Sequence, residues 1–144
     1  MIRRSVASAA LQVFYNAQEL FDELYASLAD RSTPKLLAQL ARYQPIAIDE
    51  LGYLTLKPEQ SNAFFRLMDQ RYGRVSTIIT TNLEPTAWYD LFGNKPLVDA
   101  LLDRLQHRCI TIRINGPSLR SPQPTGSAAT ASIPKARRQS AASK

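Results

Sequence analysis

Hydrophobic residues recur along this chain with two spacings, one typical of strands and the other typical of helices. Short runs rich in β-branched and aromatic residues occur at 11–15, 46–48, 75–81 and 108–114. In the last run, isoleucines alternate with other residues, as in a strand with one buried face. The stretches between these runs repeat leucines and aromatics every three or four residues. This alternation predicts an α/β fold with a largely parallel sheet and right-handed crossovers.

Capping and stop residues mark the predicted helices. Asn16, with Glu19 three residues later, resembles a capping box and begins a helix over 17–30. The apolar face of that helix carries Leu20, Phe21, Leu24, Tyr25 and Leu28. Prolines open four further helices, which we expect at 34–43, 58–72, 85–92 and 96–106.

Composition indicates one folded domain followed by a basic tail. The chain has 144 residues, 44% of them apolar, which is enough for one hydrophobic core. Its net charge of +6 is uneven, because residues 121–144 contain four basic residues and no acid. That segment is rich in Ser, Ala, Pro and Gln, so it cannot repay the entropy of ordering. We therefore expect a domain over 1–120 and a disordered tail over 121–144.

The cysteine count and the hydropathy pattern indicate a cytoplasmic protein. Cys109 is the one cysteine of the sequence, which excludes an internal disulfide and fits a reducing compartment. We expect Cys109 to pack within a strand and His107 to lie at a helix end. Neither has other potential metal ligands at a suitable spacing. No apolar run approaches the roughly 20 residues that a membrane span requires.

Polar residues follow two neighbouring strands where each strand ends. Asp49 and Glu50 come directly after 46–48, at the edge where open parallel sheets bind ligands. One acid there can hold Mg²⁺ through water while the other polarises an attacking water. Asn82 ends the next strand and can orient water against a phosphate. An acidic pair at a loop edge is the alternative, but the two strand ends together favour a nucleotide site.

Arg104 is a further candidate, on the predicted helix 96–106. An arginine fork matches phosphate oxygens and can act across a subunit interface. A plain surface ion pair with Asp99 or Asp103 is the simpler alternative. The glycine-rich phosphate loop G-x-x-x-x-G-K-[ST] cannot be written anywhere on this sequence, which has five glycines.

Five blocks occur in a fixed order, and together they resemble one family. They are IAIDELGYL at 46–54, QRY at 70–72, TTN at 80–82, ALLDRL at 100–105 and GPSLR at 116–120. The set is similar to the IstB-like ATPases, AAA+ helper proteins of insertion-sequence transposition that are related to DnaC-type helicase loaders. The resemblance covers about residues 11 to 120. It implies an incomplete P-loop NTPase domain, with a three-layer parallel sheet and helices on both faces.

The resemblance also implies roles for individual residues. Asp49 and Glu50 become the Walker B acids, with Asp49 on the metal and Glu50 catalytic. Asn82 becomes the sensor 1 residue, Arg104 the arginine finger and Arg120 the sensor 2 arginine, although Leu119 stands where the family usually has Tyr. The implied cofactors are ATP and Mg²⁺. The implied partners are DNA, a transposase and further AAA+ subunits, including intact copies of the family.

The family places a strand, the Walker A loop and its helix ahead of the position matching Leu11. The resemblance therefore implies a truncated copy in which residues 1–10 are at most the end of that helix. We expect ATP affinity to be weak, and we expect 108–114 to close the sheet by pairing with 75–81, or else an unstable chain. The leading interpretation is an ATP-binding fragment of a transposition helper. The alternatives are a non-catalytic module that docks onto intact ATPase subunits, a helicase-loader relative, and weak DNA binding by the tail.

Overall fold

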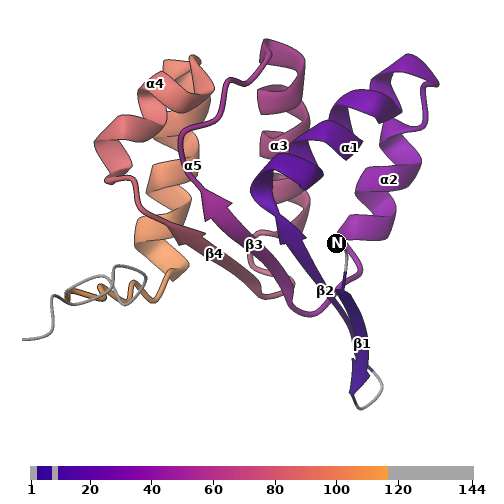
Figure 1. Ribbon diagram of the computed structural model, residues 1–144, viewed down its shortest axis with the longest axis horizontal. Helices are drawn as coiled ribbons and strands as arrows, with labels where there is room; N and C mark the ends of the chain where they lie inside the picture. Colours follow the sequence, from indigo (N-terminus) through magenta and orange to yellow (C-terminus); the bar gives the residue numbers. More distant parts are fainter. Residues whose placement is uncertain (1–2, 8–9, 117–144) are drawn as a thin grey trace, which may run out of the picture. The chain divides into compact units, whose positions relative to one another are not determined.

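The computed structural model describes residues 3–7 and 10–116, and every helix and strand in them lies within the first of two compact units, Met1–Ile110 and Thr111–Lys144. Figure 1 shows helices gathered around one sheet. The elements are, in chain order, β1 (Arg3–Ala7), β2 (Ala10–Asn16), α1 (Ala17–Ala29), α2 (Thr33–Leu40), β3 (Ile46–Leu51), α3 (Pro58–Arg71), β4 (Thr77–Thr81), a 3₁₀ turn η1 (Pro85–Ala87), α4 (Trp88–Phe92) and α5 (Lys95–Arg108).

The sheet has the order β1-β2-β3-β4, and its last three strands are parallel. This arrangement confirms the predicted α/β class and is consistent with an incomplete P-loop NTPase. The expectation for residues 1–10 was wrong, because Arg3–Ala7 is a strand that pairs antiparallel with β2 rather than the end of a helix. The two strands form the hairpin that extends from the sheet in Figure 1. The antiparallel pairing gives β1 its backbone hydrogen bonds from β2, its neighbour in the sequence.

The predicted helices form where their caps and apolar faces indicate. Asn16 accepts a hydrogen bond from the backbone N–H of Gln18 and so caps α1, as expected. The core that the helices bury against β2 and β3 includes Leu20, Phe21, Leu24, Leu37, Leu40, Phe64, Leu67 and Met68. Some predicted core residues lie nearer the surface, namely Tyr25, Leu28 and Tyr72, which are 37 to 42% exposed.

The two faces of the sheet are unequally covered. Ile46 and Ile48 of β3 are fully buried on one face. On the other face, Phe14 and Ile78 are 40% and 52% exposed, and both pair in register with Ala47. We call Phe14, Ala47 and Ile78 the exposed row. Successive strand residues point to opposite faces, so the row runs across three strands on a single surface of the sheet.

Arg71, the last residue of α3, is buried and joins three segments of the chain. Its guanidinium donates hydrogen bonds to the carbonyl of Leu40, the last residue of α2, over 2.7 Å and to that of Tyr43, in the chain after α2, over 2.9 Å. It also donates to the carbonyl of Ser76 and the hydroxyl of Thr77, at the start of β4. Burial lowers the pKa of Arg71 to about 10, so the group stays charged at neutral pH. Carbonyl oxygens thus replace the carboxylate partner that a buried arginine usually has.

The strand predicted over 108–114 does not form. Helix α5 continues through Arg108, and residues 109–115 adopt neither helix nor strand. Ile110, Ile112 and Ile114 are 79 to 92% exposed, and Cys109 is exposed rather than packed. In the part of the chain that the structure describes, β4 pairs only with β3, so the expected closure of the sheet is also wrong. Alternation alone does not make a strand, because strand stability comes from pairing and burial against neighbours.

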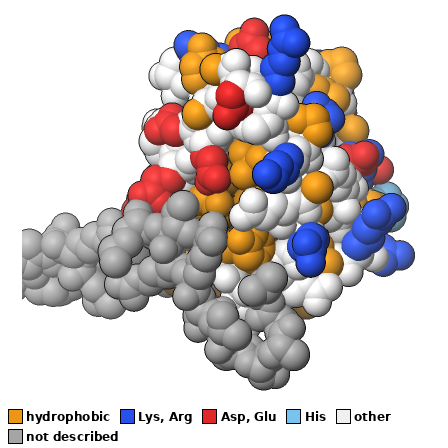
Figure 2. All heavy atoms as spheres, turned by 90° about the vertical axis from the view of Figure 1, so that its right-hand side faces the viewer, with side chains coloured by type: hydrophobic (Ala, Val, Ile, Leu, Met, Phe, Trp, Pro, Cys, Tyr) orange, Lys and Arg blue, Asp and Glu red, His pale blue; other side chains and the backbone are white. Residues whose placement is uncertain are grey.

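The remaining expectations about chain organisation concern His107, the C-terminal tail and membrane spans. His107 is exposed in the last turn of α5, as expected. The boundary at residue 120 and the tail 121–144 lie outside the described residues. Among the helices of the described ranges, none combines the length and the apolar character needed to cross a bilayer. The face drawn in Figure 2 carries acidic, basic and apolar side chains side by side.

Candidate nucleotide site

A β-bulge at the carboxyl end of β3 shapes the candidate site. The β3–β4 register passes from Ile48 opposite Ile79 to Leu51 opposite Thr81, so Asp49 and Glu50 together face one residue, Thr80. Glu50 has a φ of +59°, in the left-handed region that residues other than glycine seldom adopt. Bulges of this kind redirect side chains and occur next to active sites. The bulge explains how two neighbouring acids of one strand meet the same neighbour.

Thr80 bonds to both acids through one hydroxyl. The backbone N–H of Glu50 donates to Thr80 Oγ1 over 3.0 Å, and the Thr80 hydroxyl donates to Asp49 Oδ1. Asp49 is partly exposed and Glu50 exposed, so both carboxylates can reach a ligand from solvent. From the pattern TTN we predicted a role for Asn82, whereas the residue that contacts the acids is Thr80.

Asn16 connects the end of β2 to the same acids. It lies opposite Asp49 in the β2–β3 register, and its side-chain N–H donates to Glu50 Oε2 over 3.0 Å. Its carbonyl oxygen meanwhile caps α1. The amide of Asn16 therefore orients the Glu50 carboxylate. Sequence reasoning identified Asn16 as a cap and missed this second contact, which depends on a partner 34 residues away.

Asn82 lies just beyond β4, beside Gly52 rather than against the acids. A methyl group placed on Gly52 would come within 2.9 Å of Asn82 Oδ1. Gly52 is two residues past Glu50, so Asn82 is at the same edge of the sheet as the acids. The ends of β3 and β4 thus bring polar side chains to one edge of the sheet, with Asn82 at the margin of the group.

Arg104 lies away from the acids. Its guanidinium forms an ion pair with Asp69 of α3, with a separation of 2.7 Å, and lies over the ring of Tyr72. Asp69 is in the last turn of α3 and Tyr72 directly follows that helix, near the start of β4, whereas Asp49 and Glu50 are at the far end of the strands. The pairing alternatives with Asp99 or Asp103 were wrong, because Asp99 bonds to Tyr89 and Lys95, and Asp103 lies near His107. Arg120 lies outside the described residues.

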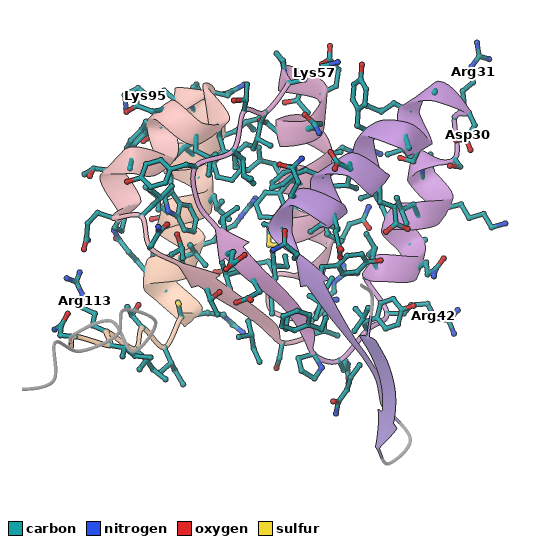
Figure 3. All side chains as sticks on the ribbon, in the orientation of Figure 1. Asp30, Arg31, Arg42, Lys57, Lys95 and Arg113 are labelled. Carbon is teal, nitrogen blue, oxygen red and sulfur yellow. The ribbon has the colours of Figure 1, made fainter. Side chains whose placement is uncertain are left out.

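Other charged side chains lie on the helical side of the molecule. Figure 3 labels Asp30 and Arg31 between α1 and α2, together with Lys57 and Lys95 at the starts of α3 and α5, and their side chains point away from the strands. The Lys57 ammonium donates to the hydroxyl of Tyr25 over 2.7 Å. These side chains lie on the surface of the helices. The carboxylates of the bulge are the described groups that suit a metal–phosphate ligand.

The donor set fits a hard cation that also binds phosphate. Mg²⁺ is usually held by one or two carboxylates, keeps several waters and takes its other ligands from nucleotide phosphates. Asp49 offers a carboxylate whose Oδ1 is already fixed by Thr80. Asp49 is partly exposed, and its second oxygen is left to bind a cation or one of the waters around it. This arrangement would suit a divalent cation whose other ligands are water or phosphate oxygens.

Comparisons with known proteins agree with one another. Residues 3–127 match the family model described as IstB-like ATP binding protein. The chain is 35% identical to the insertion sequence IS232 putative ATP-binding protein of Bacillus thuringiensis subsp. berliner, over 74% of this chain and 43% of the relative. It is 34% identical to the insertion sequence IS21 putative ATP-binding protein of Pseudomonas aeruginosa, over 75% and 41%. The chain thus spans less than half the length of these curated relatives.

Proposed function

Since the chain belongs to the IstB-like ATP-binding proteins, we propose that it carries the metal- and water-orienting part of an ATP site in an insertion-sequence protein. The observation that carries the proposal is the bulge, which joins Asp49 and Glu50 through Thr80 at the ligand-binding edge of the sheet. The names of the relatives, putative ATP-binding proteins of insertion sequences, support the same nucleotide.

Each residue of the site has a proposed part in ATP hydrolysis. Asp49 holds the Mg²⁺, which when bound neutralises charge on the phosphates. Glu50, oriented by Asn16, accepts a proton from the attacking water as general base. Asn82 binds that water or the γ-phosphate from the end of β4. Arg104 and Arg120 place positive charge next to the phosphates. Arg104 does so at the site of a neighbouring subunit, because it lies away from the acids of its own chain.

The wider role that we propose is that of a helper ATPase in DNA transposition in the cytoplasm. Such a protein would assemble as an AAA+ oligomer on DNA and act on a transposase. The relatives are ATP-binding proteins of insertion sequences, which supports this setting over the alternative of a helicase loader.

A second candidate function is non-catalytic docking onto intact ATPase subunits of the family. One observation favours it. Arg104 is 35% exposed at the end of the sheet opposite the acids, where a neighbouring subunit can reach it.

Thermal unfolding of the 144-residue chain with and without Mg-ATP tests the first proposal. A ligand that binds the folded state raises its unfolding temperature. We expect Mg-ATP to raise the transition of the wild type and of Asp90→Ala, an exposed acid of α4, and to have less effect on Asp49→Ala. An unfolding temperature that Mg-ATP leaves unchanged in all three proteins would reject nucleotide binding. Co-elution with an intact family member would then support the docking role.

A further inference from the structure

The hydroxyl of Thr80 has a fixed direction. The backbone N–H of Glu50 can only donate, and an ionised Asp49 carboxylate can only accept. With Glu50 N at 3.0 Å from Thr80 Oγ1, the single hydroxyl hydrogen is therefore committed to Asp49 Oδ1. Thr80 thus fixes the backbone of one acid and the side chain of the other at the same time.

The bulge creates the need for this hydroxyl. Two residues of β3 oppose one residue of β4 here, so the regular ladder of backbone bonds is interrupted between Ile48 and Leu51. The N–H of Glu50 falls in that interruption, and a side-chain oxygen takes the place of a backbone carbonyl. The left-handed backbone of Glu50 persists only if its surroundings hold it in place.

We propose that Thr80 is a positioning residue, whose hydroxyl holds Asp49 and Glu50 in the arrangement that binds a divalent cation. The inference rests on the proposed function, because it concerns the cation of the same site. Anchoring one Asp49 oxygen limits rotation of the carboxylate and leaves the other oxygen to bind the cation. Groups that orient a metal ligand in this way typically change metal affinity 10- to 100-fold when they are removed.

The adjacent residue provides a matched control. Thr81 has the same side chain in the same strand, yet its hydroxyl donates to the carbonyl of Leu51 and accepts from the N–H of Leu83 over 3.0 Å. Neither contact involves an acid. Thr81→Val therefore removes a hydroxyl that stabilises the strand end, whereas Thr80→Val removes the one that faces the carboxylates.

The test measures binding of Mn²⁺, a paramagnetic substitute for Mg²⁺, to the full chain by NMR. Line broadening of the Asp49 and Glu50 amide signals is followed during titration of wild type, Thr80→Val, Thr80→Ser and Thr81→Val. We expect Thr80→Val to need roughly tenfold more Mn²⁺ for the same broadening. Thr80→Ser, which keeps the hydroxyl, and Thr81→Val should both titrate as the wild type does. Thermal unfolding of each variant reports whether it is folded.

Two outcomes would overturn the inference. One is that Thr80→Val needs no more Mn²⁺ than the wild type for the same broadening, or that Thr81→Val needs as much as Thr80→Val. The other is a wild type whose Asp49 and Glu50 signals show no selective broadening at millimolar Mn²⁺. If Thr80→Val does not fold, Thr80→Ser against Thr80→Ala decides the question by the same titration. Failure of the proposed function is separate, since it appears as indifference to Mg-ATP whatever the metal alone does.

Discussion

The side-chain amide of Asn16 donates a hydrogen bond to Glu50 over 3.0 Å, while the carbonyl oxygen of the same side chain caps helix α1. One residue therefore connects the start of a helix to an acid of the candidate site. The two contacts use different atoms, so substitutions can separate them.

Replacing Asn16 should reveal the two contacts independently. Asn16→Ser keeps a capping oxygen and removes the donor to Glu50, whereas Asn16→Ala removes both. We expect Asn16→Ala to lower the free energy of unfolding by about 1 kcal/mol, and Asn16→Ser to lower it by much less. Urea denaturation measures both values. Equal losses in the two variants would mean that the cap contributes nothing measurable.

Gly52→Ala should displace Asn82 without unfolding the chain. The new methyl group would lie 2.9 Å from Asn82 Oδ1, and the asparagine side chain can swing away into solvent. We expect a change in stability within about 1 kcal/mol and a smaller effect of Mg-ATP on the unfolding temperature. Gly116→Ala is the control, since nothing lies within 4 Å of a methyl group there. An unchanged response to Mg-ATP in Gly52→Ala would remove Asn82 from the proposed site.

Substitutions in the Arg104–Asp69 ion pair can distinguish a structural role of Arg104 from a role at the site of a neighbouring subunit. Both side chains are partly exposed, at 35% and 62%, so Arg104→Ala and Asp69→Ala should each cost less than about 1 kcal/mol of stability. In mixtures with an intact family member, Arg104→Ala should lower ATP turnover and Asp69→Ala should not. A single arginine finger contributes on the order of 10³-fold. Equal turnover in the two mixtures would leave Arg104 as a surface ion pair.

The surface cluster of Tyr89, Lys95 and Asp99 predicts a loss of stability in acid. The hydrogen bond from the Tyr89 hydroxyl, followed by that from Lys95, lowers the pKa of Asp99. A carboxyl whose pKa is lowered by folding stabilises the folded state above its unfolded value of 3.8, and this contribution disappears as the pH falls through the folded value.

Tyr89→Phe removes the larger cause of that shift, so its stability should fall less than that of the wild type between pH 5 and pH 2. Urea midpoints across this range measure the difference. Asp90→Asn, an exposed acid of the same helix, is the control and should keep the pH dependence of the wild type. Parallel curves for the wild type and Tyr89→Phe would contradict the prediction.

Much of the architecture follows from the hydrophobic pattern. The strand that carries Asp49 was predictable from its apolar run, and the helices opened by Pro34 and Pro58 were predictable because local signals and a periodic apolar face agree with one another. The segment 108–114 shows the limit of such reasoning. Its alternating isoleucines fit a strand, but pairing depends on an available neighbour, which sequence spacing does not report.

The candidate site was predictable to a similar degree. The acids and Asn82 could be assigned to one sheet edge, because the carboxyl ends of parallel strands meet there. The bulge could not be predicted, since it depends on the left-handed backbone of Glu50, a residue that rarely adopts it. Thr80 and Asn16 act through contacts between strands, and these exist only after the register is set.

Arg71 has a consequence for how the chain opens and closes. Its guanidinium bonds to backbone carbonyls at and after the end of α2 and to the start of β4, so neither segment can separate without leaving a buried cation short of acceptors. The end of α3, the chain after α2 and the first turn into β4 should therefore lose their amide protection together, as one cooperative unit. The strand that carries Thr80 then begins at a point where local fraying is costly.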